Sequence, residues 1–250
     1  MKRFLVLFKL EYDGVFLPLC IIAAVMSALQ LALFGWRLGE AGTHAPLSYA
    51  IDTARISIVF AIAYVSMLAL MTARFVRNYM PSKSIYALLT LPVKRNWVYM
   101  AKLAAALLAG FMLLAAQMVL MMIFSALMGM RNICPMGHEV TRRSADLYLA
   151  LLDVGFLRML FPPDLFSLMF SVFVFFGSIC VVFYVVVGIK SGRGYNMIGI
   201  VVLWLLLMLI SFPLSDYSRS NNIMKMIAMI FAVIMAVKHG TKLFVSAEVT

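Results

Sequence analysis

Residues able to bind a metal or to activate a nucleophile are few and scattered in this sequence. The densest group is Cys134-Pro-Met-Gly-His138-Glu139, which offers three potential metal ligands within one short stretch. A structural zinc site takes four ligands, commonly from two separated pairs, and no second pair accompanies this segment. A solvated loop is therefore the favoured interpretation, and we expect neither a metal site nor a catalytic residue in the chain.

A nucleotide-binding loop is also missing from the sequence. Nothing matches the pattern GxxxxGK[ST], and Gly188-Ile-Lys190-Ser191 lacks both the first glycine and a preceding strand. If the chain works with a nucleotide, we expect a separate chain to bind it.

The composition predicts an all-α polytopic membrane protein. Of the 250 residues, 65% are hydrophobic and 12% are charged, whereas soluble domains carry about 25% charged residues. Several apolar runs exceed the ~20 residues needed to cross a bilayer. The net charge of +11 is not gathered on one solvated domain, as a nucleic-acid partner requires, so we assign it to loops near anionic headgroups.

The chain is predicted to form a single transmembrane domain over residues 1–250, with an interfacial helix at 1–13. Phe4, Phe8 and Tyr12 recur every fourth residue, which is typical of a helix in the headgroup plane, although a solvated start to the first span is the alternative. Six spans are expected at about 15–36, 56–73, 97–128, 165–189, 195–214 and 223–237. Pro18 is tolerated in the first turns of the first span.

The longest outer segment, 129–164, is expected to end in a helix that lies on or dips into the outer surface and stops at Pro162-Pro163. A seventh span at 147–161 is the alternative. With six spans and both termini cytoplasmic, thirteen of the twenty-one Lys and Arg residues face inward and eight face outward. This agrees with the retention of Lys and Arg on the cytoplasmic side, and a seventh span would lower the inner count.

Ionisable groups are missing from the interior of the predicted spans, apart from lysines near their ends. The spans contain no Asp, Glu, Arg or His, which argues against an intramembrane protease, a phosphatase, a voltage sensor and a proton antiporter. Gln30 and Gln117 are the notable polar residues at depth. Each is expected to bond a neighbouring helix, with lining a pathway as the alternative.

A more pointed pattern lies on the second predicted span. Phe60, Tyr64, Met67 and Met71 stand at i, i+4, i+7 and i+11, on one helix face. Methionine adapts to varied apolar ligands, so this stripe is a hypothetical substrate-lining face, with ordinary helix packing as the alternative.

The basic segment at 74–102 stands between two long apolar runs. It holds six cations and no acid: Arg74, Arg77, Lys83, Lys94, Arg95 and Lys102. Such a segment is expected on the cytoplasmic side. Ser82 or Ser84 can cap a short helix that Pro92 ends, and Ile85, Leu88 and Leu89 share one side of it. We expect that apolar side to be buried, either against the membrane surface or against a cytoplasmic partner.

The sequence from this short helix into the third span resembles the permease subunits of bacterial type-two ATP-binding-cassette (ABC) exporters. The resemblance rests on Leu88-Leu89-Thr90-Leu91-Pro92, on Val93-Lys94-Arg95, and on Trp97-Val-Tyr-Met-Ala-Lys102-Leu, which opens the third span. It implies that 83–91 forms a coupling helix docked on an ATPase subunit. The ATPase-coupling residues would be Lys83, Ser84, Ile85, Tyr86, Leu88, Leu89, Leu91, Pro92 and Arg95, while Lys102 would snorkel toward the headgroups.

The resemblance further implies a non-catalytic transport subunit in the bacterial cell membrane. Two permeases, identical or related, would pair with two ATPase subunits that bind ATP and Mg²⁺. In this family the second and fifth spans tend to line the path of the substrate, here an amphipathic peptide such as an antimicrobial peptide, a drug or a lipid-like molecule. A membrane-embedded enzyme and a lipid-processing or scaffold protein without transport activity are the alternatives.

Overall fold

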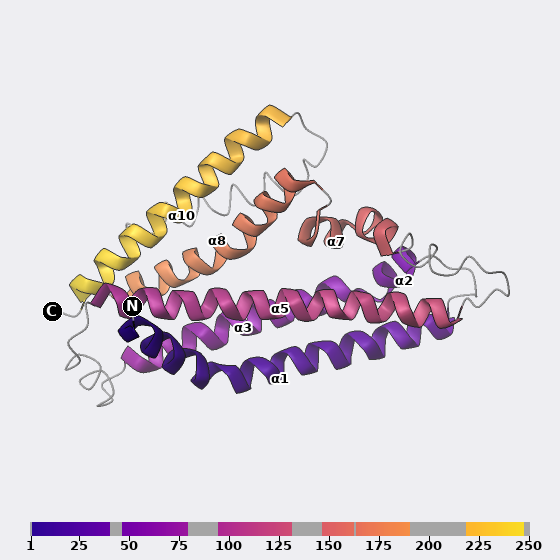
Figure 1. The fold of residues 1–250 in the computed structure, drawn as a ribbon, viewed down its shortest axis with the longest axis horizontal. Helices are drawn as coiled ribbons and strands as arrows, with labels where there is room; N and C mark the ends of the chain where they lie inside the picture. Colours follow the sequence, from indigo (N-terminus) through magenta and orange to yellow (C-terminus); the bar gives the residue numbers. More distant parts are fainter. Residues whose placement is uncertain are drawn as a thin grey trace. The chain divides into compact units, whose positions relative to one another are not determined.

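The computed structural model describes residues 2–40, 47–79, 95–131, 147–162, 164–190 and 219–247. Throughout this part of the chain, the regular structure is α-helical. Figure 1 labels the helices α1 (Lys2–Glu40), α2 (Leu47–Thr53), α3 (Ile56–Tyr79), α5 (Arg95–Arg131), α7 (Gly155–Leu160), α8 (Leu165–Lys190) and α10 (Arg219–Ala247). Residues 147–153 are helical as well.

Four of these helices are long and apolar enough to cross a membrane. The stretches are Phe4–Arg37 in α1, Ile56–Val76 in α3, Asn96–Met128 in α5 and Ser167–Ile189 in α8. Each exceeds the ~20 residues that span a bilayer. The chain is therefore an all-α protein with the helices of a membrane protein, as its composition predicts.

The predicted spans at 56–73, 97–128 and 165–189 fall within α3, α5 and α8. The sixth predicted span, 223–237, falls within α10, which is not among the four helices above. The fifth predicted span, 195–214, lies outside the described residues. So does the short helix predicted inside the basic segment.

The start of the chain differs from the prediction. No break separates residues 1–13 from a first span, because α1 continues from Lys2 to Glu40 with Pro18 inside it. Proline removes one helical hydrogen bond, but Val15 and Leu19 on either side of it are buried, and their packing holds the helix together. The buried face runs through Leu7, Glu11 and Val15, whereas the predicted aromatic stripe is half-buried.

The segment between the first two long helices contains α2. Leu47, Ala50 and Ile51 of α2 are buried and give this short helix an apolar face to pack. Arg55 then takes a left-handed conformation, with φ of 50°, and its N–H donates to the carbonyl of Asp52. This tight turn starts α3 immediately afterwards.

The helix predicted before Pro162-Pro163 is present, but in two pieces. Residues 147–153 are helical, Val154 is extended, and α7 follows and ends at Leu160. Neither described piece approaches the length of a span. A continuous seventh span at 147–161 is therefore not formed.

Contacts divide the chain into two compact units. Unit 1 holds residues 1–16, 68–108 and 172–250, and unit 2 holds residues 17–67 and 109–171. In unit 2, Gln30 lies 2.9 Å from Gln117, and the rings of Phe34 and Phe124 stack 4.2 Å apart. Both contacts join α1 to α5. The later residue of α1, Phe34, meets the later residue of α5, Phe124, so the two helices run parallel here.

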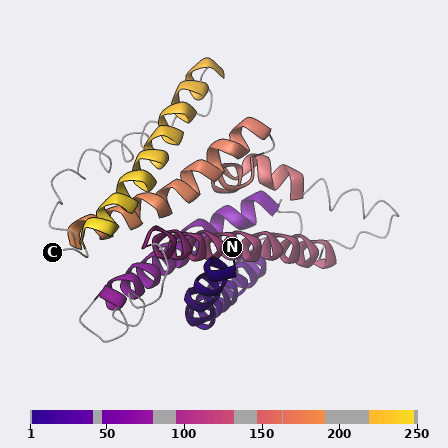
Figure 2. The same cartoon turned by 60° about the vertical axis from the view of Figure 1, so that its left-hand side comes forward.

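Unit 1 shows the same direction of α1 and α5. Phe4 packs edge-on against Trp97, and further along both helices Glu11 contacts Lys102. The last turns of α3 join them, since Phe75 packs against Phe183 of α8 and lies beside Lys102. In Figures 1 and 2, α8 and α10 approach each other at their C-terminal ends. There Gly240 of α10 lies against Tyr99 and Tyr184.

Candidate functional site

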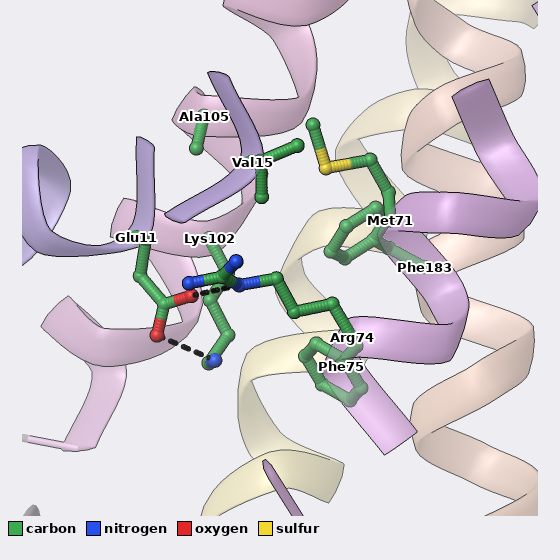
Figure 3. Close-up of a pocket in the computed structure, with 8 residues that line it drawn as sticks. All are labelled: Glu11, Val15, Met71, Arg74, Phe75, Lys102, Ala105 and Phe183. Carbon is green, nitrogen blue, oxygen red and sulfur yellow. Dashed lines mark hydrogen bonds and ion pairs between the residues drawn. The ribbon is translucent and has the colours of Figure 1, made fainter. Parts of the chain in front are cut away.

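A cluster of three charged side chains lies inside unit 1 (Figure 3). Lys102 Nζ of α5 donates to Glu11 Oε1 of α1 at 2.7 Å. Arg74 Nε of α3 lies 3.8 Å from the other carboxylate oxygen, Glu11 Oε2. We call Glu11, Arg74 and Lys102 the charge cluster, and it joins three helices through one carboxylate.

Burial makes this cluster energetically important. The side chains of Lys102 and Glu11 are 6% and 12% exposed, and that of Arg74 is 24% exposed. Taking charges out of water costs several kcal/mol per ion, and pairing must offset that cost. Breaking such a pair strands the remaining charge, so we expect the cluster to hold α1, α3 and α5 in one arrangement.

Helix periodicity brings these side chains together. Glu11 stands four residues after Leu7 and four before Val15, on the buried face of α1. Arg74 lies near the C-terminal end of α3, and Lys102 lies two turns into α5. The Lys102 ammonium also sits 5.7 Å from the centre of the Phe75 ring, which adds a cation–π contact.

The charge cluster borders a small pocket. Figure 3 shows its apolar walls, formed by Val15, Met71, Phe75, Ala105 and Phe183. Its cavity volume is about 10 Å³, which is close to the amount that one water molecule needs. The pocket thus has room for a single small atom, and a peptide or drug does not fit in this arrangement.

Gly14 allows Arg74 to reach the cluster. The guanidinium group of Arg74 lies so close to Gly14 that a Cβ atom there would overlap it. By contrast, a Cβ atom on Gly35, in the same helix, would meet nothing within 4 Å. The absence of a side chain at Gly14 therefore leaves the space that the Arg74 guanidinium group occupies.

The predicted ATPase-coupling residues fall almost entirely outside the described residues. This applies to Lys83, Ser84, Ile85, Tyr86, Leu88, Leu89, Leu91 and Pro92. Arg95 is the first residue of α5, but the structure does not describe its side chain. Their role stays a prediction. The described residues do include the two ends of the basic segment, Arg74 and Lys102, and both contact Glu11.

The predicted substrate-lining stripe is divided between the two units. Phe60 and Met67 are buried in unit 2, where the Phe60 ring lies 5.4 Å from that of Phe156. Tyr64 is half-buried, and Met71 lines the pocket of the charge cluster in unit 1. A joint role of the four residues in a substrate path stays a prediction.

One expectation about charge is wrong. Lys102 was expected to snorkel toward the headgroups, yet it is buried and bonded to Glu11. The predicted spans 15–36 and 56–73 contain no Glu or Arg, but the apolar helical stretches extend beyond them, so that Glu11 lies within Phe4–Arg37 and Arg74 lies within Ile56–Val76. The signal that could have revealed this is the acid at position 11, at the centre of the spacing Leu7, Glu11, Val15.

The expectation for the two glutamines is confirmed. Gln30 Nε2 donates to Gln117 Oε1 at 2.9 Å, and both side chains are fully buried in unit 2. Gln30 Oε1 and Gln117 Nε2 are buried without a hydrogen-bond partner among the described residues. The pair thus joins α1 to α5 with one interhelical hydrogen bond, as small polar pairs do in membrane helix bundles.

A metal centre is not apparent in the described part of the chain, where no three His, Cys, Asp or Glu side chains gather. Cys134, His138 and Glu139 lie outside it. In comparisons with known proteins, the chain matches no family model, no curated protein and no solved structure.

Proposed function

We propose that this chain is the permease subunit of an ATP-driven exporter in a bacterial cell membrane, with six spans and both termini cytoplasmic. A separate ATPase subunit, present in two copies, binds ATP and Mg²⁺ and docks on the apolar side of the helix predicted at 83–91. Two permeases, identical or related, enclose the path. The substrate is an amphipathic peptide, a drug or a lipid-like molecule.

The observation that carries this proposal is the position of the charge cluster at both ends of the basic segment. Arg74 precedes the segment predicted to dock on the ATPase, and Lys102 follows it. Both contact Glu11 of α1 in unit 1. A displacement of the docked segment therefore acts on α3 and α5 together, and through Glu11 on α1. A transporter that alternates between two states needs contacts that differ between these states.

The directions of the helices support an even number of spans. Phe4 near the N-terminus lies against Trp97, and Gly240 near the C-terminus lies against Tyr99, so both ends of the described chain meet the first turns of α5. Proteins whose two ends emerge on one side of a membrane cross it an even number of times. Six spans satisfy this condition.

The position of the start of α10 supports a further membrane span between α8 and α10. Gly240 lies beside Tyr184, near the end of α8, and Arg219 stands 21 residues earlier in α10, about 30 Å away along a helix. That separation is close to the thickness of a bilayer core. The fifth span predicted at 195–214 would carry the chain across this distance between α8 and α10.

Purification from native membranes tests the proposal. A tagged chain is expected to carry an ATPase with it, and Leu88→Asp is expected to lose that ATPase because the substitution places a charge on the apolar side of the predicted helix. Thr90→Asp, on the opposite side, is the matched control and should retain the partner. A non-ATPase partner that is lost in Leu88→Asp would instead identify a scaffold or assembly protein.

A further inference from the structure

We propose that the pocket of the charge cluster binds the anionic head of a membrane amphiphile, such as a phospholipid phosphate or a fatty-acid carboxylate, on Arg74. This site is distinct from the proposed ATPase contact, and it shares a single residue, Met71, with the hypothetical stripe on α3. It depends on neither nucleotide nor a partner chain, so the inference stands or falls independently of the transport proposal.

The first observation is an excess of positive charge. Glu11 supplies one negative charge for two cations, Arg74 and Lys102. Lys102 takes the closer contact, at 2.7 Å, and Arg74 Nε remains 3.8 Å from the carboxylate, beyond hydrogen-bonding distance. With Lys102 protonated, the cluster carries a surplus of one positive charge, and buried charge favours a counterion.

The second observation is an unused donor beside the pocket. Arg74 Nε is buried and has no hydrogen-bond partner among the described residues. Arg74 lines the pocket, and Figure 3 shows its guanidinium group beside the Glu11 carboxylate. Leaving a buried donor unpaired is costly, and an anionic oxygen is its strongest partner. Because the planar guanidinium group matches phosphate and carboxylate geometry, Arg74 suits either head.

The third observation concerns size and surroundings. The pocket admits about one small atom, so a head enters with one oxygen and keeps its remaining atoms outside. Arg74 is the most exposed member of the cluster, which places the accessible side of the site at this residue. The walls are apolar, and the helices that form them belong to the four stretches suited to a membrane. These surroundings favour an amphiphile over a free inorganic anion.

Native mass spectrometry of the purified chain, with no ATPase present, tests the site. Detergent-solubilised protein is titrated with phosphatidylglycerol, and with diacylglycerol, which lacks the phosphate, for comparison. Phosphatidylglycerol is expected to bind more tightly. Arg74→Gln should weaken this binding about tenfold or more, because a charged hydrogen bond is lost. Glu11→Gln should strengthen it severalfold, because the competing acid is removed. A purely structural cluster would give losses in both variants.

A second pair of variants keeps the test decisive if Glu11→Gln folds poorly. Gly14→Ala moves the Arg74 guanidinium group while retaining its charge, and it should weaken the binding of phosphatidylglycerol. Gly35→Ala changes the same helix at a position without neighbours, and it should leave binding unchanged. Unaltered affinity in Arg74→Gln, or equal binding of both lipids, overturns the proposal. Full competition by inorganic phosphate overturns the requirement for an amphiphile.

Discussion

Glu11 and Lys102 stand 91 positions apart in the sequence, yet their side chains form a buried ion pair of 2.7 Å. The same carboxylate faces Arg74 at 3.8 Å. One acid near the start of the chain therefore contacts both ends of the basic segment 74–102. This arrangement gives α1 a structural role in unit 1 that differs from that of a helix lying alone in the headgroups.

Removal of either member of the pair is expected to destabilise the protein. Glu11→Gln leaves the buried Lys102 without its acid, which typically costs about 3–5 kcal/mol. Lys102→Gln should cost less, because Arg74 still faces Glu11 at 3.8 Å. The double variant Glu11→Gln/Lys102→Gln should lose less than the sum of the two, because it leaves neither member of the 2.7 Å pair without the other. Chemical unfolding in detergent measures all four proteins of this cycle, and strictly additive losses would show that the two side chains do not interact.

The hydrogen bond between the two buried glutamines is expected to contribute more modestly. Gln30→Leu strands the amide of Gln117, and Gln117→Leu strands that of Gln30. Each change should cost about 1 kcal/mol, the typical scale for interhelical hydrogen bonds in membranes. Gln30→Leu/Gln117→Leu should be close to wild type in thermal denaturation. A double variant less stable than either single variant would contradict this account.

Gly240 is expected to be sensitive to the addition of a single methyl group. A Cβ atom there would approach the Tyr99 hydroxyl oxygen to 2.5 Å and its Cζ to 3.0 Å, and the Tyr99 side chain is fully buried. Because the ring has little room to move, Gly240→Ala should destabilise by about 1–3 kcal/mol, as overpacking does. Gly35→Ala is the control, with no neighbour to displace. Equal melting temperatures for the two variants would exclude this close contact.

Local composition explains which helices the sequence pattern predicted, and long-range pairing explains what the pattern missed. The positions of α3, α5 and α8 follow from apolar runs bounded by polar residues, so local composition is sufficient to locate them. The continuity of α1 was missed because Lys9, Glu11 and Asp13 interrupt its apolar run. The ion pair that buries Glu11 comes from α5 and leaves no trace in the local pattern.

The two buried polar contacts between α1 and α5 illustrate the same limit. A glutamine within an apolar run has few options other than a neighbouring helix, so the Gln30–Gln117 bond could be anticipated. Lys102 offered a second option, because a long side chain near a helix end can reach the headgroups. Tertiary packing decided between them, and the chain used Lys102 to neutralise Glu11.

The most direct test of the transport proposal measures the reactivity of the predicted coupling helix in membranes. Ile85→Cys and Leu88→Cys are introduced singly into a chain whose cysteines, Cys20, Cys134 and Cys180, are replaced by alanine. The rate of labelling by a membrane-impermeant maleimide is then measured in inside-out vesicles, with and without ATP and vanadate. We predict slow labelling at both positions, with a rate that changes with nucleotide, and rapid labelling at a control Thr90→Cys. A labelling rate that is the same with and without nucleotide would contradict the proposal that this chain is an ATPase-coupled permease. Labelling from the outer face of intact cells would contradict it as well.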